Sequence, residues 1–183
     1  MKKNFSGFSL MELLIVIAII GIVVTGLSRV SFNKQIDNQK AQAFSNSIYT
    51  NIETTRNIAL LGKGFGSGAT FFYPEKIILN INTINNTISG SYLKSGITYN
   101  LPNFLVEFPD KHALIKKLTF KNLDETNSST GQAVGIEFIG NTITLSGASI
   151  NQKILEIETD YKGFKNIIKI NSTTGVMEKV KVN

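Results

Sequence analysis

The sequence predicts an α+β fold, in which a long N-terminal α-helix packs on an antiparallel β-sheet and the first half of that helix crosses a membrane. Three observations lead to this prediction. Residues 8–28 are almost entirely apolar, residues 29–61 continue with the spacing of an amphipathic helix, and residues 62–183 consist of short β-type runs separated by turn residues. Because the helix-type and strand-type patterns occupy separate parts of the chain, they indicate one helix followed by one globular β-rich domain.

The apolar run of residues 8–28 carries a single charge, Glu12. At about 1.5 Å per residue, a helix over this run covers about 31 Å, close to the hydrocarbon thickness of a bilayer. A carboxylate in such a run is costly, and it indicates a functional site by default. Lys2 and Lys3 precede the run, which places the rest of the chain outside the cytoplasm. The alternative is a secretory signal peptide, for which Val24-Thr25-Gly26 is a weak cleavage site.

Residues 29–61 repeat apolar residues at steps of three, four or seven, which is the pattern of a helix with one face packed on a sheet. The members of this predicted buried stripe are Phe32, Ile36, Ala43, Phe44, Ile48, Ile52 and Ala59. No proline interrupts the segment, so we expect one continuous helix from Ser9 to about Leu61. A glycine-rich segment at residues 62–68 then ends it, because closely spaced glycines are unfavourable in a helix.

Short runs rich in β-branched and aromatic residues follow, each bounded by turn residues. The expected strands are residues 69–73, 76–82, 97–101, 104–108, 117–120, 134–139, 142–145, 154–159, 166–170 and 176–182. Gly140-Asn141 separates two of these runs and predicts a tight hairpin. Residues 173–175 predict a second hairpin before the final strand.

The composition argues against an enzyme. The chain has no cysteine and a single histidine, His112, so neither a zinc site nor a nucleophilic triad can be assembled from it. No cofactor is expected. The acidic loop at Asp124 and Glu125 is a weak calcium candidate, because it lacks the ligand spacing of an EF-hand. Removal of residues 1–7, which include two lysines, would leave 17 basic and 13 acidic residues and lower the formal net charge from +6 to +4, a mild excess that does not require a nucleic-acid partner.

The segment from Gly7 to Gly21, GFSLMELLIVIAIIG, resembles the processing and assembly signal of the type IV pilin and pseudopilin superfamily. The resemblance implies that residues 1–7 are a leader removed by prepilin peptidase. It also implies that Phe8 becomes the N-methylated first residue of the mature protein, and that Glu12 docks against the N-terminus of a neighbouring subunit. The chain would then be a pilin-like structural subunit of a type IV pilus-like or type II secretion filament. Its partners would be other pilins or pseudopilins and an inner-membrane assembly platform.

The residues themselves agree with these roles. Cleavage between Gly7 and Phe8 would place a new α-amino group four residues before Glu12, about one helical turn away. A desolvated ammonium–carboxylate pair adds little net stability, but it fixes the register between helices. Before assembly, the subunit would be a single-pass inner-membrane protein held in the lipid bilayer, with its C-terminal domain outside the cytoplasm. After assembly, it would belong to a periplasmic or extracellular filament.

One departure from the resemblance concerns Arg29. Many major pilins have a proline shortly after the apolar run, and Arg29 stands at that place here. Local melting of the helix in a filament is therefore expected to rest on Gly21 and Gly26, each roughly 1 kcal/mol less favourable in a helix than alanine.

The β-rich half bears a fainter likeness to H-type pseudopilins and FimT-like minor pilins, carried by residues 118–120, 136–138, 168–171 and 174–176. Through that likeness, a DNA-binding minor pilin is the alternative function. The basic residues expected to contact DNA are Lys162, Lys165, Lys179 and Lys181. Aromatic residues near the first two could stack on bases. A third reading, a membrane-anchored exported enzyme, lacks candidate catalytic residues.

Overall fold

The computed structural model describes residues 9–65, 71–101, 104, 106 and 108–181; the side chains of residues 27–31 and of Lys181 are not described. The chain divides into two compact units, Met1–Asn38 and Gln39–Asn183. The boundary falls inside the N-terminal helix, so the second unit contains the C-terminal part of that helix together with all the strands. The architecture is α+β, as the sequence predicted.

The helix α1 runs without interruption from Leu10 to Leu60, which confirms the long helix expected from the sequence. It ends where Gly62 adopts a left-handed backbone conformation with φ of 57°. The Gly62 N–H then donates to the Ala59 carbonyl at 3.3 Å, and the Lys63 N–H donates to the Ile58 carbonyl at 3.0 Å. These two hydrogen bonds form a Schellman motif, in which glycine is favoured because it has no Cβ.

The buried face of α1 begins later along the helix than the sequence pattern suggested. Its buried residues are Ala41, Phe44, Ser45, Ile48, Ile52 and Thr55. Phe44, Ile48 and Ile52 are therefore buried as predicted. Phe32 is 65% exposed, Ile36 is 36% exposed and Ala43 is also exposed, so these three predictions were wrong. A helical period identifies a face, but it does not say which turns of that face have a sheet beside them.

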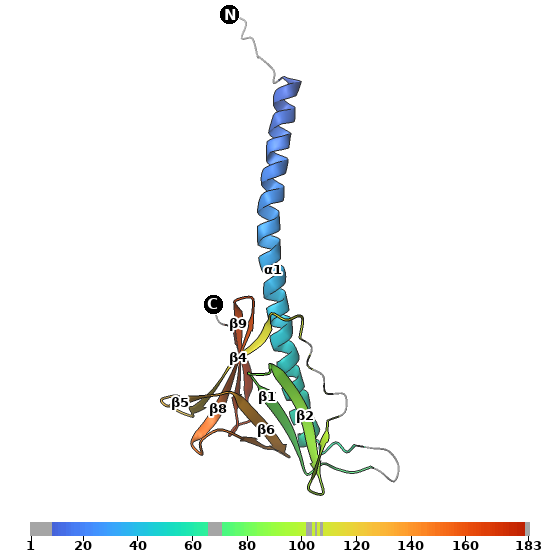
Figure 1. The fold of residues 1–183 in the computed structure, drawn as a ribbon, viewed down its shortest axis with the longest axis vertical. Helices are drawn as coiled ribbons and strands as arrows, with labels where there is room; N and C mark the ends of the chain where they lie inside the picture. The colour runs from blue at the N-terminus through green and yellow to red at the C-terminus, as the bar shows by residue number, and fades with distance from the viewer. Residues whose placement is uncertain (1–8, 66–70, 102–103, 105, 107, 182–183) are drawn as a thin grey trace, which may run out of the picture. The chain divides into compact units, whose positions relative to one another are not determined.

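In the described residues, ten strands form two five-stranded antiparallel sheets, whereas the sequence predicted one sheet. The first sheet has the order β3-β2-β1-β6-β7, with strands Ile97–Asn100, Thr87–Lys94, Lys76–Asn82, Ala133–Ile139 and Thr142–Leu145. The second has the order β10-β9-β8-β4-β5, with strands Met177–Lys181, Phe164–Asn171, Gln152–Tyr161, Ala113–Asn122 and Ser128–Gly131. Figure 1 shows β1 and β2 beside the C-terminal part of α1 within the second unit.

Both predicted hairpins are confirmed, since β6 pairs with β7 across Gly140-Asn141 and β9 pairs with β10. Strands β2 and β5 were not predicted, because serine and glycine are poor strand formers. Their glycines are required by packing. A Cβ on Gly90 would lie 2.8 Å from the Phe104 ring, and one on Gly131 would lie 2.7 Å from the Phe120 ring.

Two predicted strands do not form in the described residues. At residues 71–73 only Phe72 makes an isolated bridge, with Phe65, and residues 69–70 lie outside the described residues. Residues 104, 106 and 108 are not in a strand, and residues 105 and 107 are not described. Phe104 and Phe108 instead pack against the hydrophobic core from a segment that is not a strand. Aromatic residues are enriched in strands, so the composition alone does not distinguish such a segment from a strand.

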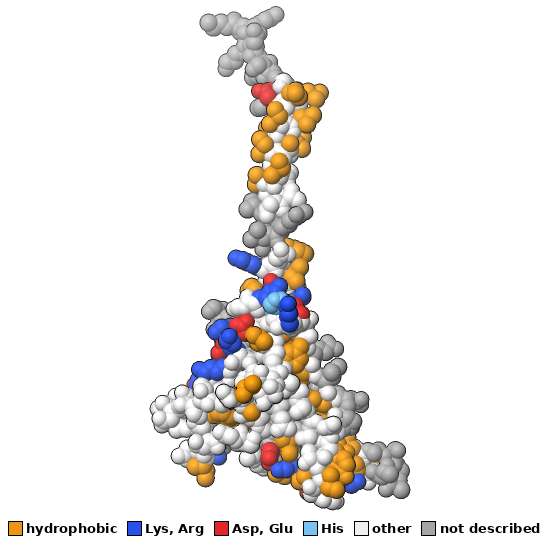
Figure 2. Space-filling model, viewed as in Figure 1, with side chains coloured by type: hydrophobic (Ala, Val, Ile, Leu, Met, Phe, Trp, Pro, Cys, Tyr) orange, Lys and Arg blue, Asp and Glu red, His pale blue; other side chains and the backbone are white. Residues whose placement is uncertain are grey.

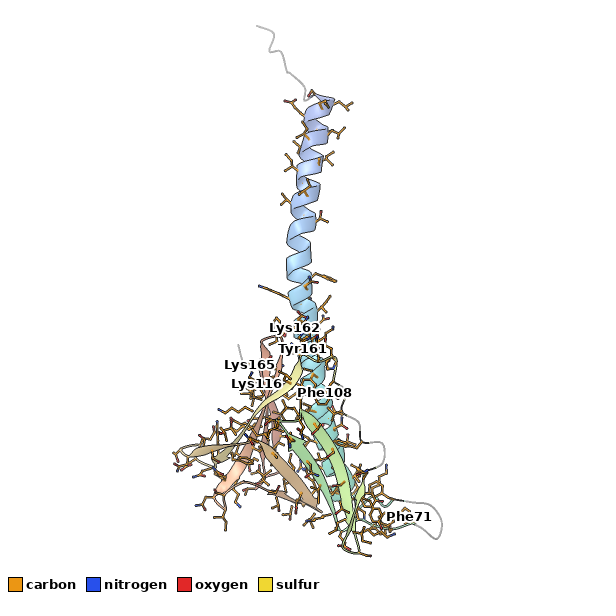
Figure 3. The ribbon with its side chains drawn as sticks, viewed as in Figure 1. Phe71, Phe108, Lys116, Tyr161, Lys162 and Lys165 are labelled. Atoms are coloured by element: carbon orange, nitrogen blue, oxygen red, sulfur yellow. The ribbon has the colours of Figure 1, made fainter. Side chains whose placement is uncertain are left out.

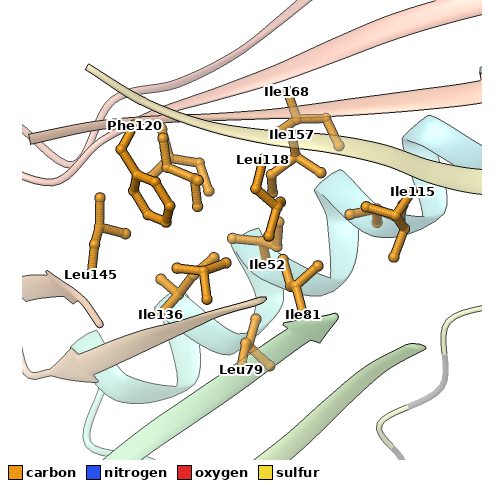
Figure 4. Close-up of a cluster of buried hydrophobic side chains, with 14 of the residues drawn as sticks. Ile52, Leu79, Ile81, Ile115, Leu118, Phe120, Ile136, Leu145, Ile157 and Ile168 are labelled. Atoms are coloured by element: carbon orange, nitrogen blue, oxygen red, sulfur yellow. The ribbon is translucent and has the colours of Figure 1, made fainter. Parts of the chain in front are cut away.

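The core joins α1 to both sheets. Ile52 of α1 lies among Leu79 and Ile81 of β1 and Leu118 of β4, as Figure 4 shows, and each of these side chains is at most 1% exposed. Because the three layers share one apolar core, the C-terminal part of α1 is an integral part of the globular unit.

Candidate functional site

The N-terminus of α1 carries a reciprocal cap that involves the predicted assembly residue. The Glu12 backbone N–H donates to Ser9 Oγ at 3.2 Å, and the Ser9 backbone N–H donates to Glu12 Oε2 at 3.0 Å. This pair is a capping box, which satisfies two of the N–H groups that a helix start leaves without partners. The Ser-x-x-Glu spacing at residues 9–12 was a usable sequence signal for it. Gly7 and Phe8, the predicted cleavage residues, lie outside the described residues.

The first part of α1 presents apolar side chains all around its surface. Every residue from Ser9 to Gly26 is exposed, and the large hydrophobic side chains range from 45% exposed at Val16 to 80% at Leu10. Figure 2 shows hydrophobic side chains along the visible side of this stretch of helix. A contiguous exposed apolar surface of this kind marks a site of interaction with protein or lipid. Among the residues that the structure describes, no helix has both the length and the apolar character needed to span a membrane.

The helix passes through both glycines that were expected to weaken it. Gly21 and Gly26 have helical backbone conformations, and no atom lies within 4 Å of the position a Cβ would take on either. The Thr25 hydroxyl donates back to the Gly21 carbonyl, a hydrogen bond typical of threonine inside helices. Arg29 lies within α1, and its side chain is outside the described residues. Melting of this stretch in a filament stays a prediction.

A comparison with protein families finds a match in this same N-terminal segment. Residues 2–28 match the family described as the prokaryotic N-terminal methylation motif. This match supports the resemblance of the N-terminal segment to the type IV pilin and pseudopilin superfamily. The motif is a structural one and does not define an enzyme family. It covers residues 2–7 of the predicted leader, the predicted methylation site at Phe8 and the capped Glu12. The chain matches no curated protein and no solved structure.

The lysines of the predicted DNA contact lie on neighbouring strands at one side of the second sheet. Lys162 is in the β8–β9 turn and Lys165 is near the start of β9. Lys179 and Lys181 are on β10, where Lys181 pairs in register with Asn166 of β9. Figure 3 shows Lys162 and Lys165 near Tyr161, the last residue of β8. The fold therefore gathers residues that the sequence separates.

Two of these side chains already have a local role. Lys165 Nζ lies 2.9 Å from Glu158 Oε1, and this hydrogen bond raises the pKa of Lys165. Lys179 donates to Asn46 Oδ1 of α1. An ammonium paired with a carboxylate has to give up that pair before it can neutralise a phosphate, which weakens binding. DNA binding stays a prediction, and the structure offers less uncompensated charge for it than the sequence indicated.

The calcium candidate lies in the turn between β4 and β5. The Glu125 carboxylate contacts Lys169 and, at 3.4 Å, Lys121, and these two lysines lower its pKa. Asp124 accepts the Thr126 backbone N–H at 3.1 Å, which lowers the pKa of Asp124. Two ammonium groups at one carboxylate repel a further cation. In the described part of the chain, no group of three or more histidine, aspartate or glutamate side chains is placed to hold a metal ion.

His112 belongs to a small polar network before β4. Asp110 accepts the Tyr161 hydroxyl at 2.7 Å and the His112 backbone N–H at 2.8 Å, and His112 Nδ1 lies 3.0 Å from the same carboxylate. These hydrogen bonds, with the Tyr161 hydroxyl first, lower the pKa of Asp110 to about 2. Tyr161 is fully buried, so the network ties the loop at residues 110–112 to the end of β8. Its role is to hold the fold at that end of the sheet.

Proposed function

We propose that this chain is a structural, non-enzymatic subunit of a type IV pilus-like or type II secretion filament, assembled through its N-terminal helix. The main support for this proposal is that two features lie on the same segment. The methylation motif at residues 2–28 overlaps the start of α1, where the described apolar side chains, up to Val24, are all exposed and the first turn holds Glu12. A methylation motif at the N-terminus and an exposed apolar helix surface beside it both support assembly through this segment.

The exposed apolar surface requires an apolar environment at every stage. Leaving it in water would cost about 25 cal/mol for each Å² of apolar surface. Before assembly, we propose that residues 8–28 lie in the inner membrane, with prepilin peptidase removing residues 1–7 on the cytoplasmic side. After assembly, the same side chains would pack against the helices of other subunits at the filament core. One segment then serves first as an anchor and later as an interface.

Glu12 would set the register of that interface. In the single chain, Glu12 Oε2 accepts the Ser9 N–H. A carboxylate has about four acceptor sites, so this cap leaves room for the α-amino group of a neighbouring Phe8. In an apolar surrounding, a carboxylate without a cationic partner is strongly disfavoured. A subunit stacked in the wrong register would therefore be rejected.

Mass spectrometry of the native N-terminus tests the processing step. The expected mature chain begins at Phe8 with a methylated α-amino group. A chain that still begins at Met1, or one that was cut near Gly26, would contradict the proposal.

A matched pair of variants tests the assembly step. Glu12→Gln removes the charge but keeps a residue that can complete a capping box, whereas Ser9→Ala keeps the charge and weakens the cap by about 1 kcal/mol. We expect Glu12→Gln to insert normally and to abolish filaments, and Ser9→Ala to assemble. Electron microscopy of cell-surface or sheared fractions gives the readout, with membrane fractionation as the control for insertion. Normal filaments from Glu12→Gln would refute the charge-pairing argument.

A further inference from the structure

A polar cleft lies between α1 and the edge strand β10 of the second sheet. It has a volume of about 210 Å³ and is lined by Gln42, Ser45, Asn46, Asn166 and Lys179. The first three come from neighbouring turns of α1, Asn166 comes from β9, and Lys179 comes from β10. All five residues are polar, one is cationic and none is acidic. The cleft is therefore electrostatically suited to a group with negative charge.

Ser45 lines this cleft and has a buried hydroxyl that is left unexplained. Its side chain is only 2% exposed, and its buried Oγ has no hydrogen-bond partner among the described residues. A serine inside a helix commonly donates to the carbonyl four residues earlier. Here that carbonyl, on Ala41, accepts the Asn166 side-chain amide at 3.4 Å instead. A buried hydroxyl without a partner calls for a water, an ion or a ligand.

Lys179 supplies the charge. Its ammonium donates to Asn46 Oδ1 and lies 5.4 Å from the centre of the Tyr49 ring, and no carboxylate of the described chain lies within 4 Å of it. By contrast, Lys121, Lys165 and Lys169 on the same sheet each pair with a glutamate. An ammonium has three donors, so two remain after the contact with Asn46. Lys179 is thus held in place by neutral groups with its charge uncompensated.

We propose that this cleft binds a carboxylate, with Lys179 as the charged partner and the Ser45 hydroxyl as a second donor. The Asn166 amide, 9% exposed, lies at the wall of the cleft beside them. The volume exceeds the roughly 30 Å³ share of a water molecule several-fold, so a carboxylate group fits. Two sources supply this chemistry: a free carboxylate in solution, or an aspartate or glutamate side chain of a second copy of this chain. The second source rests on the proposed filament, whereas the first does not.

Acetate is the probe for the full-length chain in detergent micelles, with chloride at equal ionic strength as the reference. We expect the NMR signals of the Asn166 side-chain amide to shift saturably with acetate. Ser45→Ala should weaken acetate binding about fivefold, and Lys179→Gln should weaken it about tenfold or more, because a charged hydrogen bond contributes more than a neutral one.

Two matched controls separate the cleft from general charge effects. Ser47→Ala changes a serine of the same helix that does not line the cleft, and Lys117→Gln removes an exposed lysine of β4. Both should bind acetate as the unmodified chain does. Ser45→Ala also replaces serine by a better helix former, so it will not fail to fold. The absence of a saturable shift, or equal binding by Ser45→Ala and the unmodified chain, would overturn the proposal.

Assembled filaments distinguish the two sources. If a second copy supplies the carboxylate, the Asn166 signals of the filament should no longer respond to acetate, although those of the micellar chain do. If they still respond, the site takes a free carboxylate. A chain that never forms filaments would defeat the proposed function but would leave the micelle titration intact, so the two failures are distinguishable.

Discussion

Replacing Ile52 by alanine tests whether the helix belongs to the globular core. Ile52 is 0% exposed and lies on α1 among side chains of both sheets (Figure 4). The substitution removes three carbon atoms, which at about 0.8 kcal/mol for each buried methylene corresponds to roughly 2.4 kcal/mol of lost transfer energy. Because three layers enclose the site, it cannot collapse fully, and a cavity term adds to this loss. The higher helix propensity of alanine returns only a few tenths of a kcal/mol.

We therefore expect the free energy of unfolding to fall by about 2–4 kcal/mol. For a unit the size of residues 39–183, this corresponds to a drop in Tm of roughly 6–14 °C. Thermal unfolding of the full chain in detergent, followed by circular dichroism in the β-sheet region, gives the measurement. Ile36→Ala is the control, because the sequence pattern assigned Ile36 to the same stripe but it is 36% exposed. A loss below about 1 kcal/mol for Ile52→Ala, or equal losses for both variants, would refute the three-layer core.

Two other predictions concern the network at Asp110 and the left-handed glycines. The pKa of Asp110 is lowered to about 2 in the folded state, so its contribution to stability is complete above the ordinary pKa of 3.8 and is lost as the pH falls from about 4 to about 2. Tyr161→Phe should raise that pKa, as a carboxyl NMR titration would show, and should reduce the loss of stability in this pH window; an unchanged pKa would contradict the assignment. Gly175→Ala should destabilise by about 1–2 kcal/mol, because φ is 71° and a Cβ would lie 2.4 Å from the Arg56 guanidinium. Gly140→Ala, with φ of 54° and open space around it, is the control in denaturant melts; a larger loss at Gly140 than at Gly175 would exclude the contact with Arg56.

Local patterns were sufficient where the structure is determined by neighbours in sequence. The continuous helix from Leu10 to Leu60 follows from apolar spacing and the absence of proline. Tight hairpins at residues 140–141 and 173–175 follow from turn chemistry. The Ser9–Glu12 cap was equally available in the sequence, because it depends on a three-residue spacing alone.

Sequence patterns did not predict the features that depend on contacts between segments far apart in the chain. The sequence of strand β5 is typical of a polar turn, yet this strand pairs with β4. Its Gly131 lies against the Phe120 ring, and a Cβ at this position would be 2.7 Å from the ring. Lysines 165 and 179 look equivalent in the sequence, but one pairs with Glu158 while the other faces Asn46 on α1, more than a hundred residues earlier. The partner of Lys179 lies on an element that no local window around Lys179 contains.

The sequence by itself predicted an assembly signal around Gly7, Phe8 and Glu12, because such a signal is a short contiguous motif, and residues 2–28 match the prokaryotic N-terminal methylation motif. It also determined the helix and its capped start, which are set by interactions within one or two turns. Only the tertiary structure decided that the strands divide between two sheets, that the buried stripe begins at Ala41, and that Ser45 and Lys179 share a cleft. These features arise from contacts between segments far apart in the chain, and burial and pairing of that kind are properties of the folded arrangement.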